Sequence, residues 1–142
     1  MATGKKSIYR ARKARELLQD VFGKNEWEHN RTWLKRGYIV EYVLHESRKG
    51  AARLLVSHLF QHMIIEYFAV EKKHRKKGIG KELCDILKDK ANKLGYALYV
   101  CASEESKPLY FWIKMDGLIE DQEVDIPDFS ELYSNVILLK LA

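Results

Sequence analysis

The stretch Val70–Leu83, VEKKHRKKGIGKEL, decides how this sequence folds. Every residue of 72–77 is Lys, Arg or His, and Gly78 and Gly80 follow. The run 63–70, MIIEYFAV, is apolar except at position 66, which is typical of a strand buried on both faces. Apolar residues recur afterwards at helical spacing, at Ile79, Leu83, Ile86, Leu87, Ala91 and Leu94. The pattern predicts a strand, a basic glycine turn and a helix that ends at Gly95.

The basic turn has the features of a phosphate-binding loop. The N–H groups in the first turn of a helix lack intrahelical partners, and the helix dipole makes that end positive. Glycines let a bulky anion approach those N–H groups, and Lys and Arg add charge-assisted bonds. A Walker loop is excluded, because it needs glycine where Arg75 stands and serine or threonine where Glu82 stands. The dinucleotide-binding fingerprint is excluded too, because its third glycine would fall at Leu83.

The rest of the sequence predicts an α/β fold with a mixed sheet. With 142 residues and 46% hydrophobic content, the chain suits a single domain over 1–142. Besides the helix at 79–94, apolar spacing and capping residues predict helices at 11–22, 25–36 and 103–115. Runs of β-branched, aromatic and leucine residues predict strands at 38–45, 53–60, 63–70, 96–102, 118–124 and 135–141. The polar segment 46–50 would join the first two strands as a hairpin.

Composition narrows the class of protein. The net charge is +5, so the surface should attract anions such as phosphates. The sequence has no apolar run long enough to span a bilayer and no apolar signal segment near its start, so we expect neither a membrane span nor secretion. Cys84 and Cys101 lack metal-binding spacing, and His58 and His62 have no evident third ligand, so we expect reduced thiols and no metal. The expected location is the cytosol, with the nucleus as the alternative.

Residues 75–80, RKKGIG, match the signature Arg/Gln-x-x-Gly-x-Gly/Ala, and the sequence resembles the GCN5-related N-acetyltransferase (GNAT) superfamily. The likeness covers 63–117 by motif and 38–142 by order of elements. It implies a GNAT-like α/β fold, with a mixed, mostly antiparallel central sheet flanked by about four helices. It also implies acetyl-CoA as the cosubstrate and direct attack of an acceptor amine on the thioester. The pyrophosphate would lie on the basic turn, at Arg75, Lys76, Lys77, Gly78, Ile79, Gly80 and Lys81. The pantetheine would pair with the strand at Phe68, Ala69 and Val70, and a backbone N–H near Val70 would meet the oxyanion.

Glu66 is the candidate general base. It is the one acidic residue in the run 63–70, and strand alternation predicts that it shares a face with Phe68 and Val70. An aliphatic ammonium has a pKa of about 10, so a base must remove its proton before attack. Glu66 could do so through a water molecule, or could attract a cationic amine, and the spermidine/spermine acetyltransferases carry Glu at the same offset. The alternative is a carboxylate paired with Arg or Lys across the sheet.

The family's general acid is a tyrosine in the motif Phe-Tyr-x-Lys-x-Gly-Phe, and this sequence lacks it. Alignment places Ile113 or Trp112 at the matching position, depending on register. Tyr110 lies one helical turn before Ile113 and is the candidate acid, with a packed aromatic residue as the alternative. The missing tyrosine favours an alternative function, a non-catalytic acyl-CoA-binding regulatory module.

The expected acceptor is a primary amine, either on a cationic small molecule such as a polyamine or on a protein lysine or N-terminus. A cationic acceptor is suggested by a group of acidic residues, for which a solvated acidic face is the alternative: Glu104, Glu105, Glu120, Asp121, Glu123 and Asp125. A basic nucleic-acid-associated adaptor, based on the stretches 5–15 and 72–77, is less favoured, because it explains the charge but not the glycines. Members of the family often pair, so a homodimer stays open.

Overall fold

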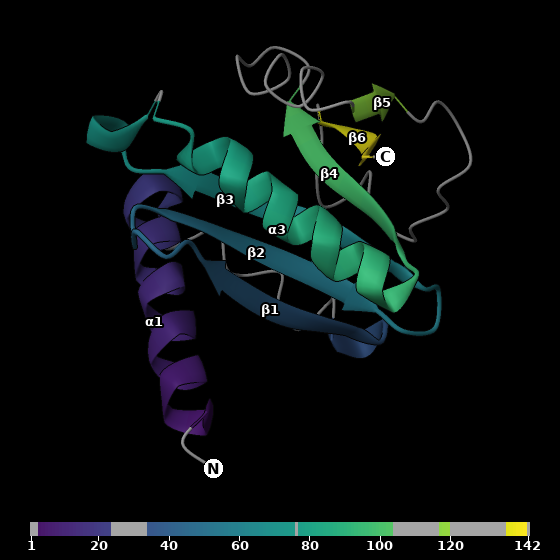
Figure 1. Ribbon diagram of the computed structural model, residues 1–142. Helices are drawn as coiled ribbons and strands as arrows, with labels where there is room; N and C mark the ends of the chain where they lie inside the picture. The colour runs from purple at the N-terminus through teal and green to yellow at the C-terminus, as the bar shows by residue number, and fades with distance from the viewer. Residues whose placement is uncertain (1–2, 24–33, 76, 104–116, 120–135, 142) are drawn as a thin grey trace.

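The structure, a computed structural model, describes residues 3–23, 34–75, 77–103, 117–119 and 136–141 (Figure 1). Its centre is a six-stranded sheet with the order β1-β2-β3-β4-β6-β5. The elements are α1 (Thr3–Phe22), β1 (Tyr38–Leu44), β2 (Gly50–Ser57), β3 (His62–Val70), the short 3₁₀ helix η2 (Lys72–His74), α3 (Ile79–Leu94), β4 (Ala97–Ser103), β5 (Gly117–Ile119) and β6 (Val136–Leu141). Neighbouring strands are antiparallel except β3 and β4, which run parallel, so the predicted mixed, mostly antiparallel sheet is confirmed.

Most predicted elements lie within a few residues of the observed ones, but the second strand was placed three residues too late. It was expected at 53–60, whereas β2 begins at Gly50 and ends at Ser57. The apolar pair Leu59 and Phe60 caused the error, since both lie in the turn after β2 and are largely exposed. The hydroxyl of Ser57 accepts the Phe60 N–H at 3.1 Å, and this bond closes the turn. The helices expected at 25–36 and 103–115 fall almost wholly outside the described residues.

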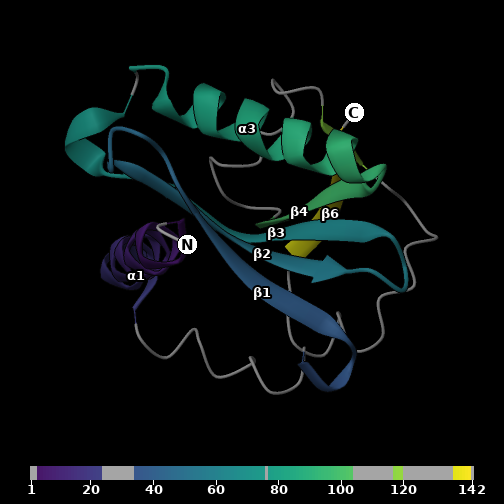
Figure 2. The ribbon, with the colours of Figure 1, turned by 60° about the horizontal axis from the view of Figure 1, so that its bottom comes forward.

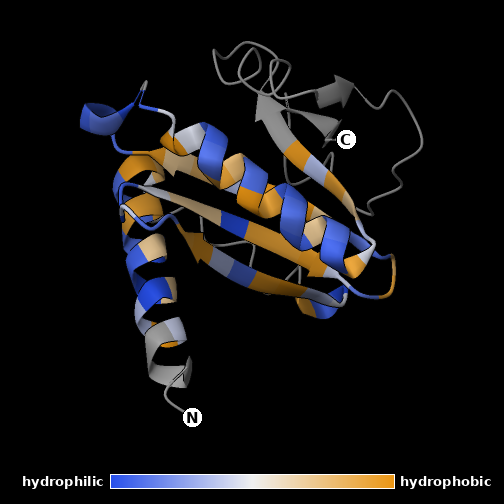
Figure 3. Cartoon of the chain, in the orientation of Figure 1, coloured by the Kyte–Doolittle hydropathy of each residue, from blue (hydrophilic) through white to orange (hydrophobic). Residues whose placement is uncertain are grey.

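The sheet carries one described helix on each face (Figure 2). The buried cluster on the α3 side comprises Ala52, Leu54, Val56, Met63, Ile65, Leu83, Cys84, Leu87, Ala91, Leu98 and Val100. The cluster on the α1 side comprises Ala14, Leu17, Leu18, Leu44, Ala51, Tyr67 and Ala69. Apolar side chains therefore alternate between the two faces along β2, and hydrophobic and hydrophilic residues alternate along α3 (Figure 3).

An irregularity in β3 interrupts this alternation. Arg53 of β2 is opposite Tyr67, whereas the next residue, Leu54, is opposite Ile65, so Glu66 is an extra residue in β3. An extra residue of this kind is a β-bulge, which bends the strand and shifts the side chains beyond it to the other face. Met63 and Ile65 therefore pack under α3, while Tyr67 and Ala69 pack under α1.

The sheet opens at this bulge. β3 pairs with β4 only from His62 to Ile65, opposite residues 97–100. Beyond it, residues 101–103 of β4 pair with β6, and residues 67–70 of β3 pair, among the described strands, with β2. The ribbons of β3 and β4 point apart at their C-terminal ends (Figure 1). Among the described strands, the part of β3 that leads into the basic turn thus has a neighbour only on the β2 side, and its other side faces a gap in the sheet.

Candidate functional site

The backbone of β3 presents polar groups to this gap. The N–H of Glu71 donates to the carbonyl of Lys49 at 2.7 Å, which makes that pair a hydrogen-bonded one. Because such pairs alternate along an antiparallel ladder, the N–H and C=O of Val70 and Phe68 point away from β2. The carbonyl of Val70 accepts instead from Nε of Arg75, at 3.1 Å. The N–H of Val70 and the backbone groups of Phe68 therefore point to the gap side, whereas the backbone groups of Ala69 face β2.

The basic turn continues directly from this strand. Residues 72–74 form η2, Arg75 is extended, and Gly78 adopts a left-handed conformation (φ +86°) as the N-cap of α3. Among the described residues, no side chain caps the helix, and, apart from the chain neighbours and the backbone of α3 itself, no atom of theirs lies within 4 Å of the place where a Cβ of Gly78 would stand. The N–H groups of the first helical residues, Ile79, Gly80 and Lys81, consequently face an open, positively polarised end.

The residues predicted for the pyrophosphate take different places in this turn. Arg75, Lys77 and Lys81 are exposed, and Lys76 lies outside the described residues. The side chain of Ile79 is buried, and its Cγ2 lies 2.9 Å from the position that a Cβ of Gly50 would occupy. Ile79 thus anchors the turn to the start of β2 through its side chain, while its N–H remains at the helix end. The turn can hold an anion by backbone groups surrounded by cationic side chains.

Glu66 lies at the bulge in an ion pair. Its Oε1 is 2.6 Å from Nε of Arg53, and the two side chains are 1% and 0% exposed. The guanidinium also lies 3.4 Å from the hydroxyl of Tyr42, and 5.9 Å from the ring centres of Tyr42 and Tyr67. A buried arginine keeps its charge, and a paired carboxylate balances it. The geometry therefore shows the cross-sheet pairing that was the alternative for this residue.

The face predicted for Glu66 was wrong, and the bulge is the reason. Simple alternation would place Glu66 with Phe68, which packs against the cluster under α3. The extra residue puts Glu66 instead beside Arg53 and Tyr67, on the side of the sheet that α1 covers. Sequence alternation alone gives no sign of a bulge, although a single charged residue in an apolar strand marks the position where it occurs.

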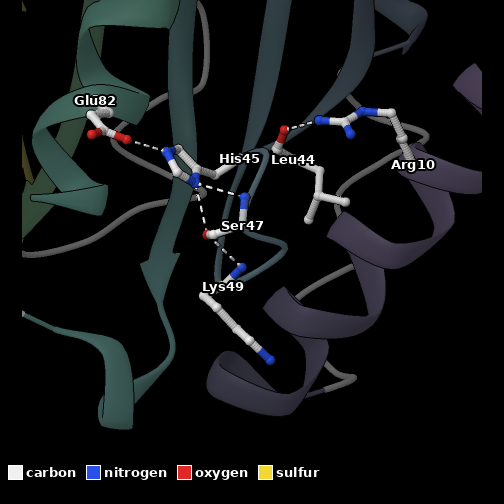
Figure 4. A network of polar contacts seen from close by, with 6 residues as sticks. All are labelled: Arg10, Leu44, His45, Ser47, Lys49 and Glu82. Atoms are coloured by element: carbon white, nitrogen blue, oxygen red, sulfur yellow. Dashed lines mark hydrogen bonds and ion pairs between the residues drawn. The ribbon is translucent and has the colours of Figure 1, made fainter. Parts of the chain in front are cut away.

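A polar network that the sequence did not predict links the β1–β2 turn to α3 (Figure 4). Nε2 of His45 lies 2.6 Å from Oε2 of Glu82, and its Nδ1 lies 2.7 Å from the hydroxyl of Ser47. Arg10 of α1 contacts the carbonyl of Leu44 beside it. His45 and Glu82 are separated by 37 residues, so only the tertiary structure brings them together.

A second buried polar pair lies at the other end of β3. The hydroxyl of Tyr38 is 2.6 Å from Nε2 of His62, and both residues are buried. Burial raises the pKa of Tyr38 to about 12 and lowers the pKa of His62, because each ring loses the water that stabilises its charged form. The residues that the structure describes contain no group of three or more His, Cys, Asp or Glu arranged to hold a metal ion.

Several predicted site residues fall outside the described residues. They are Tyr110, the candidate acid, together with Trp112, Ile113, Lys76 and the acidic residues between 104 and 125. Among the described helices, none is both long and apolar enough to cross a membrane.

Comparison with known proteins points to one family. Residues 12–111 match the acetyltransferase (GNAT) family. A search of curated proteins gave no match. Among solved structures, the chain is similar to a GNAT family acetyltransferase from Elizabethkingia anophelis with acetyl-CoA bound, at 21% identity and a TM-score of 0.63, over 89% of this chain and 88% of that one.

Two further structures show the same likeness. A Bacillus subtilis acetyltransferase in complex with CoA is 22% identical, with a TM-score of 0.63 over 90% of each chain. A nourseothricin acetyltransferase is 14% identical, with a TM-score of 0.55. The likeness covers 75% of this chain and 66% of that protein. At these identities the likeness establishes the fold.

Proposed function

Since the chain belongs to the GNAT family of acetyltransferases, we propose that it transfers an acetyl group from acetyl-CoA directly to a primary amine. The observation that carries the proposal is the adjacency of two features: the opening of the sheet beyond Glu66, and the uncapped helix end at Gly78. An extended arm with amide groups fits the first feature, and a pyrophosphate fits the second. Acetyl-CoA has both parts, and similar structures hold acetyl-CoA or CoA.

In this proposal the backbone does most of the binding. The N–H groups of Ile79, Gly80 and Lys81 would hold the pyrophosphate, with Arg75, Lys76 and Lys77 adding positive charge. The pantetheine would pair with Phe68 and Val70 in the gap, as an added strand pairs with a sheet edge. Acetyl-CoA supplies an activated thioester. No metal is required for this chemistry.

The proposed reaction needs one proton acceptor and one site for developing negative charge. The amine nitrogen forms a bond to the carbonyl carbon, the carbon–sulfur bond breaks, and the nitrogen loses a proton. The Val70 N–H, which points away from β2, would stabilise the oxyanion. Glu66 is the proposed proton acceptor, through a water molecule, with Arg53 fixing its carboxylate. Tyr110 stays a prediction for the group that protonates the leaving thiolate.

The acceptor is proposed to be cationic, on the basis of the acidic residues between 104 and 125. A polyamine, a protein lysine and a protein N-terminus all fit that description. The location in the cytosol or nucleus and the pairing of two chains likewise stay predictions.

A non-catalytic acyl-CoA-binding module is the second candidate function. It is favoured by the absence of the family tyrosine at Ile113 or Trp112, and by the ion pair that occupies Glu66. The two functions differ in one measurement. Both predict acetyl-CoA binding, but only the enzyme releases thiol when an amine is added.

Calorimetric titration with acetyl-CoA tests both candidates. Gly78→Glu would place a carboxylate at the open helix end and should abolish binding. Gly95→Glu is the matched control, because Gly95 is also left-handed (φ +71°) with nothing within 4 Å, but lies at the opposite end of α3. Both variants carry the same strain and the same charge change. Equal loss of binding in both would show that the effect of Gly78→Glu is general destabilisation.

A screen of amines for thiol release then separates the two functions. Turnover with a polyamine or a lysine peptide supports the transferase. Tight acetyl-CoA binding without thiol release from any amine supports the regulatory module. A folded protein that binds no acetyl-CoA excludes both.

A further inference from the structure

The β1–β2 turn, residues 45–49, and the first residue of β2, Gly50, contact the basic turn at both of its ends. At the first end, the Lys49 carbonyl accepts the Glu71 N–H at 2.7 Å. At the second, Gly50 packs against Ile79, and His45 contacts Glu82 in the first turn of α3. Figure 4 shows His45 between the β1–β2 turn and α3, with its ring nitrogens facing Ser47 on one side and Glu82 on the other. The β1–β2 turn therefore supports the segment proposed to bind pyrophosphate.

The hydrogen bonds of His45 fix the position of its proton. The backbone N–H of Ser47 donates to Nδ1 at 3.1 Å, so Nδ1 is an acceptor. The Ser47 hydroxyl lies 2.7 Å from the same nitrogen, and accepts the N–H of Lys49 at 3.1 Å. With Nδ1 accepting, we assign the ring N–H to Nε2, from which it donates to Oε2 of Glu82 at 2.6 Å. The buried ring is held at both nitrogens and presents a fixed donor to the carboxylate.

Glu82 is the one acidic residue in the first turn of α3. Its own N–H already donates to the carbonyl of Gly78 at 3.0 Å, so only its side chain is free to change position. A carboxylate in a first turn is attracted to the positive helix end, which is also where a pyrophosphate would bind. The side chain is 65% exposed, so few packing contacts restrict it apart from the bond to His45.

We propose that His45 is a positioning residue for acetyl-CoA: it holds the Glu82 carboxylate against the β1–β2 turn and thereby keeps this negative charge from competing with the pyrophosphate. This inference rests on the proposed function, because it assigns the pyrophosphate to the helix end at Gly78. It gives His45 a role in affinity for the cosubstrate. His45 itself touches no part of the reacting groups.

Two single variants distinguish this role from a purely structural one, because they act in opposite directions. Glu82→Gln removes the competing charge and should tighten acetyl-CoA binding by about two- to fivefold at low salt. His45→Asn keeps an oxygen acceptor for the Ser47 N–H but loses the donor to Glu82. It should weaken binding by about the same factor, because the released carboxylate approaches the helix end. The double variant should bind like Glu82→Gln alone, since His45 acts only through that charge.

The controls show which charge on α3, and which part of acetyl-CoA, is responsible for a change in affinity. Asp85→Asn removes an equal charge one turn further along α3, and should change affinity much less than Glu82→Gln. Acetyl-pantetheine, which lacks the pyrophosphate, should bind all variants alike. Salt should reduce the Glu82→Gln effect. Circular dichroism establishes that each variant is folded. If His45→Asn does not fold, the direction in which Glu82→Gln changes acetyl-CoA affinity still tests the inference.

Opposite shifts of the two single variants, absent for acetyl-pantetheine, support the inference. Weaker binding in Glu82→Gln, or an equal gain in Asp85→Asn, overturns it while leaving the proposed function intact. A folded wild-type protein that does not bind acetyl-CoA overturns the proposed function and this inference with it.

Discussion

Replacing Arg53 by methionine should destabilise the protein strongly, because it leaves the carboxylate of Glu66 buried without its cation. The two side chains are 0% and 1% exposed, and their nearest atoms are 2.6 Å apart. Methionine keeps an unbranched apolar stem of similar length and removes only the charge and the hydrogen-bond donors. The remaining carboxylate is 1% exposed and has lost its counter-charge, so it must either stay charged at high cost or take up a proton.

The expected magnitude follows from the burial of the pair. Breaking a buried ion pair by removal of one partner costs about 3–5 kcal/mol. Folded domains have about 0.05–0.15 kcal/mol of stability per residue, so this chain of 142 residues should have on the order of 7–20 kcal/mol. Removal of Arg53 would thus take away a large share of the free energy of unfolding. Replacing both partners, with Arg53→Met and Glu66→Leu, should recover most of it, because apolar pairs often substitute for buried ion pairs without loss.

Urea denaturation followed by circular dichroism measures these effects. The wild type, both single variants and the double variant form a cycle that isolates the coupling between the two residues. Lys90→Met provides the control, because it breaks the Lys90–Glu41 ion pair, which has a similar length of 2.9 Å but side chains that are 38% and 37% exposed. Loss of such an exposed pair should cost at most about 1 kcal/mol.

Two results would refute this reasoning. If Arg53→Met costs no more than Lys90→Met, the pair is solvated and its burial does not determine its energy. If the double variant is as unstable as the sum of the singles, the two charges are not coupled. The outcome also affects the test of Glu66 as a base: Glu66→Gln unpairs Arg53 as well, so its activity must be measured where the variant is folded. A changed pH–rate profile, rather than a lower rate alone, identifies the proton acceptor.

Two further predictions concern the ends of β3. Gly50→Ala places a methyl group 2.9 Å from Cγ2 of Ile79, so it should lower the free energy of unfolding by about 1–3 kcal/mol, measured by thermal unfolding. Ile79→Ala in the same chain should relieve the clash. An unchanged melting temperature in Gly50→Ala would contradict the close packing. Burial lowers the pKa of His62 below its usual 6.5, so the unfolded state binds the proton first and stability should fall as pH drops below about 6.5. His62→Gln should flatten that decline, and an unaltered slope would exclude His62 as its source.

The order of elements could be predicted from sequence because each rests on local signals. The helix Ile79–Leu94 has apolar residues at helical spacing between two glycines, and the structure places left-handed glycines at both of its ends. The strand before it could be predicted because most of its side chains are buried, and a strand buried on both faces has a nearly continuous apolar sequence. The error in β2 has the same cause: Leu59 and Phe60 are apolar yet exposed, so hydrophobicity extended the prediction into the turn.

The arrangement of the candidate site could be predicted only in part. The glycines and cations of the basic turn are contiguous, so their chemistry can be read without knowing the fold. The partners of Glu66 and Glu82 cannot be read from the sequence in this way, because Arg53 and His45 belong to other strands or turns. Nothing in the local sequence selects one basic residue over another. Such partners depend on strand register, which a single extra residue changes.

The bulge at Glu66 explains why the gap in the sheet and the buried Arg53–Glu66 ion pair occur together. An extra residue in β3 ends its pairing with β4, and the gap in the sheet begins at that point. The same residue cannot pack as its neighbours do, because the alternation of faces changes there. An apolar side chain would serve the core equally well, yet the chain places a carboxylate here and compensates it with a fully buried arginine. A buried pair of this kind contributes little to stability compared with apolar packing, so folding alone does not explain why a carboxylate stands at this position.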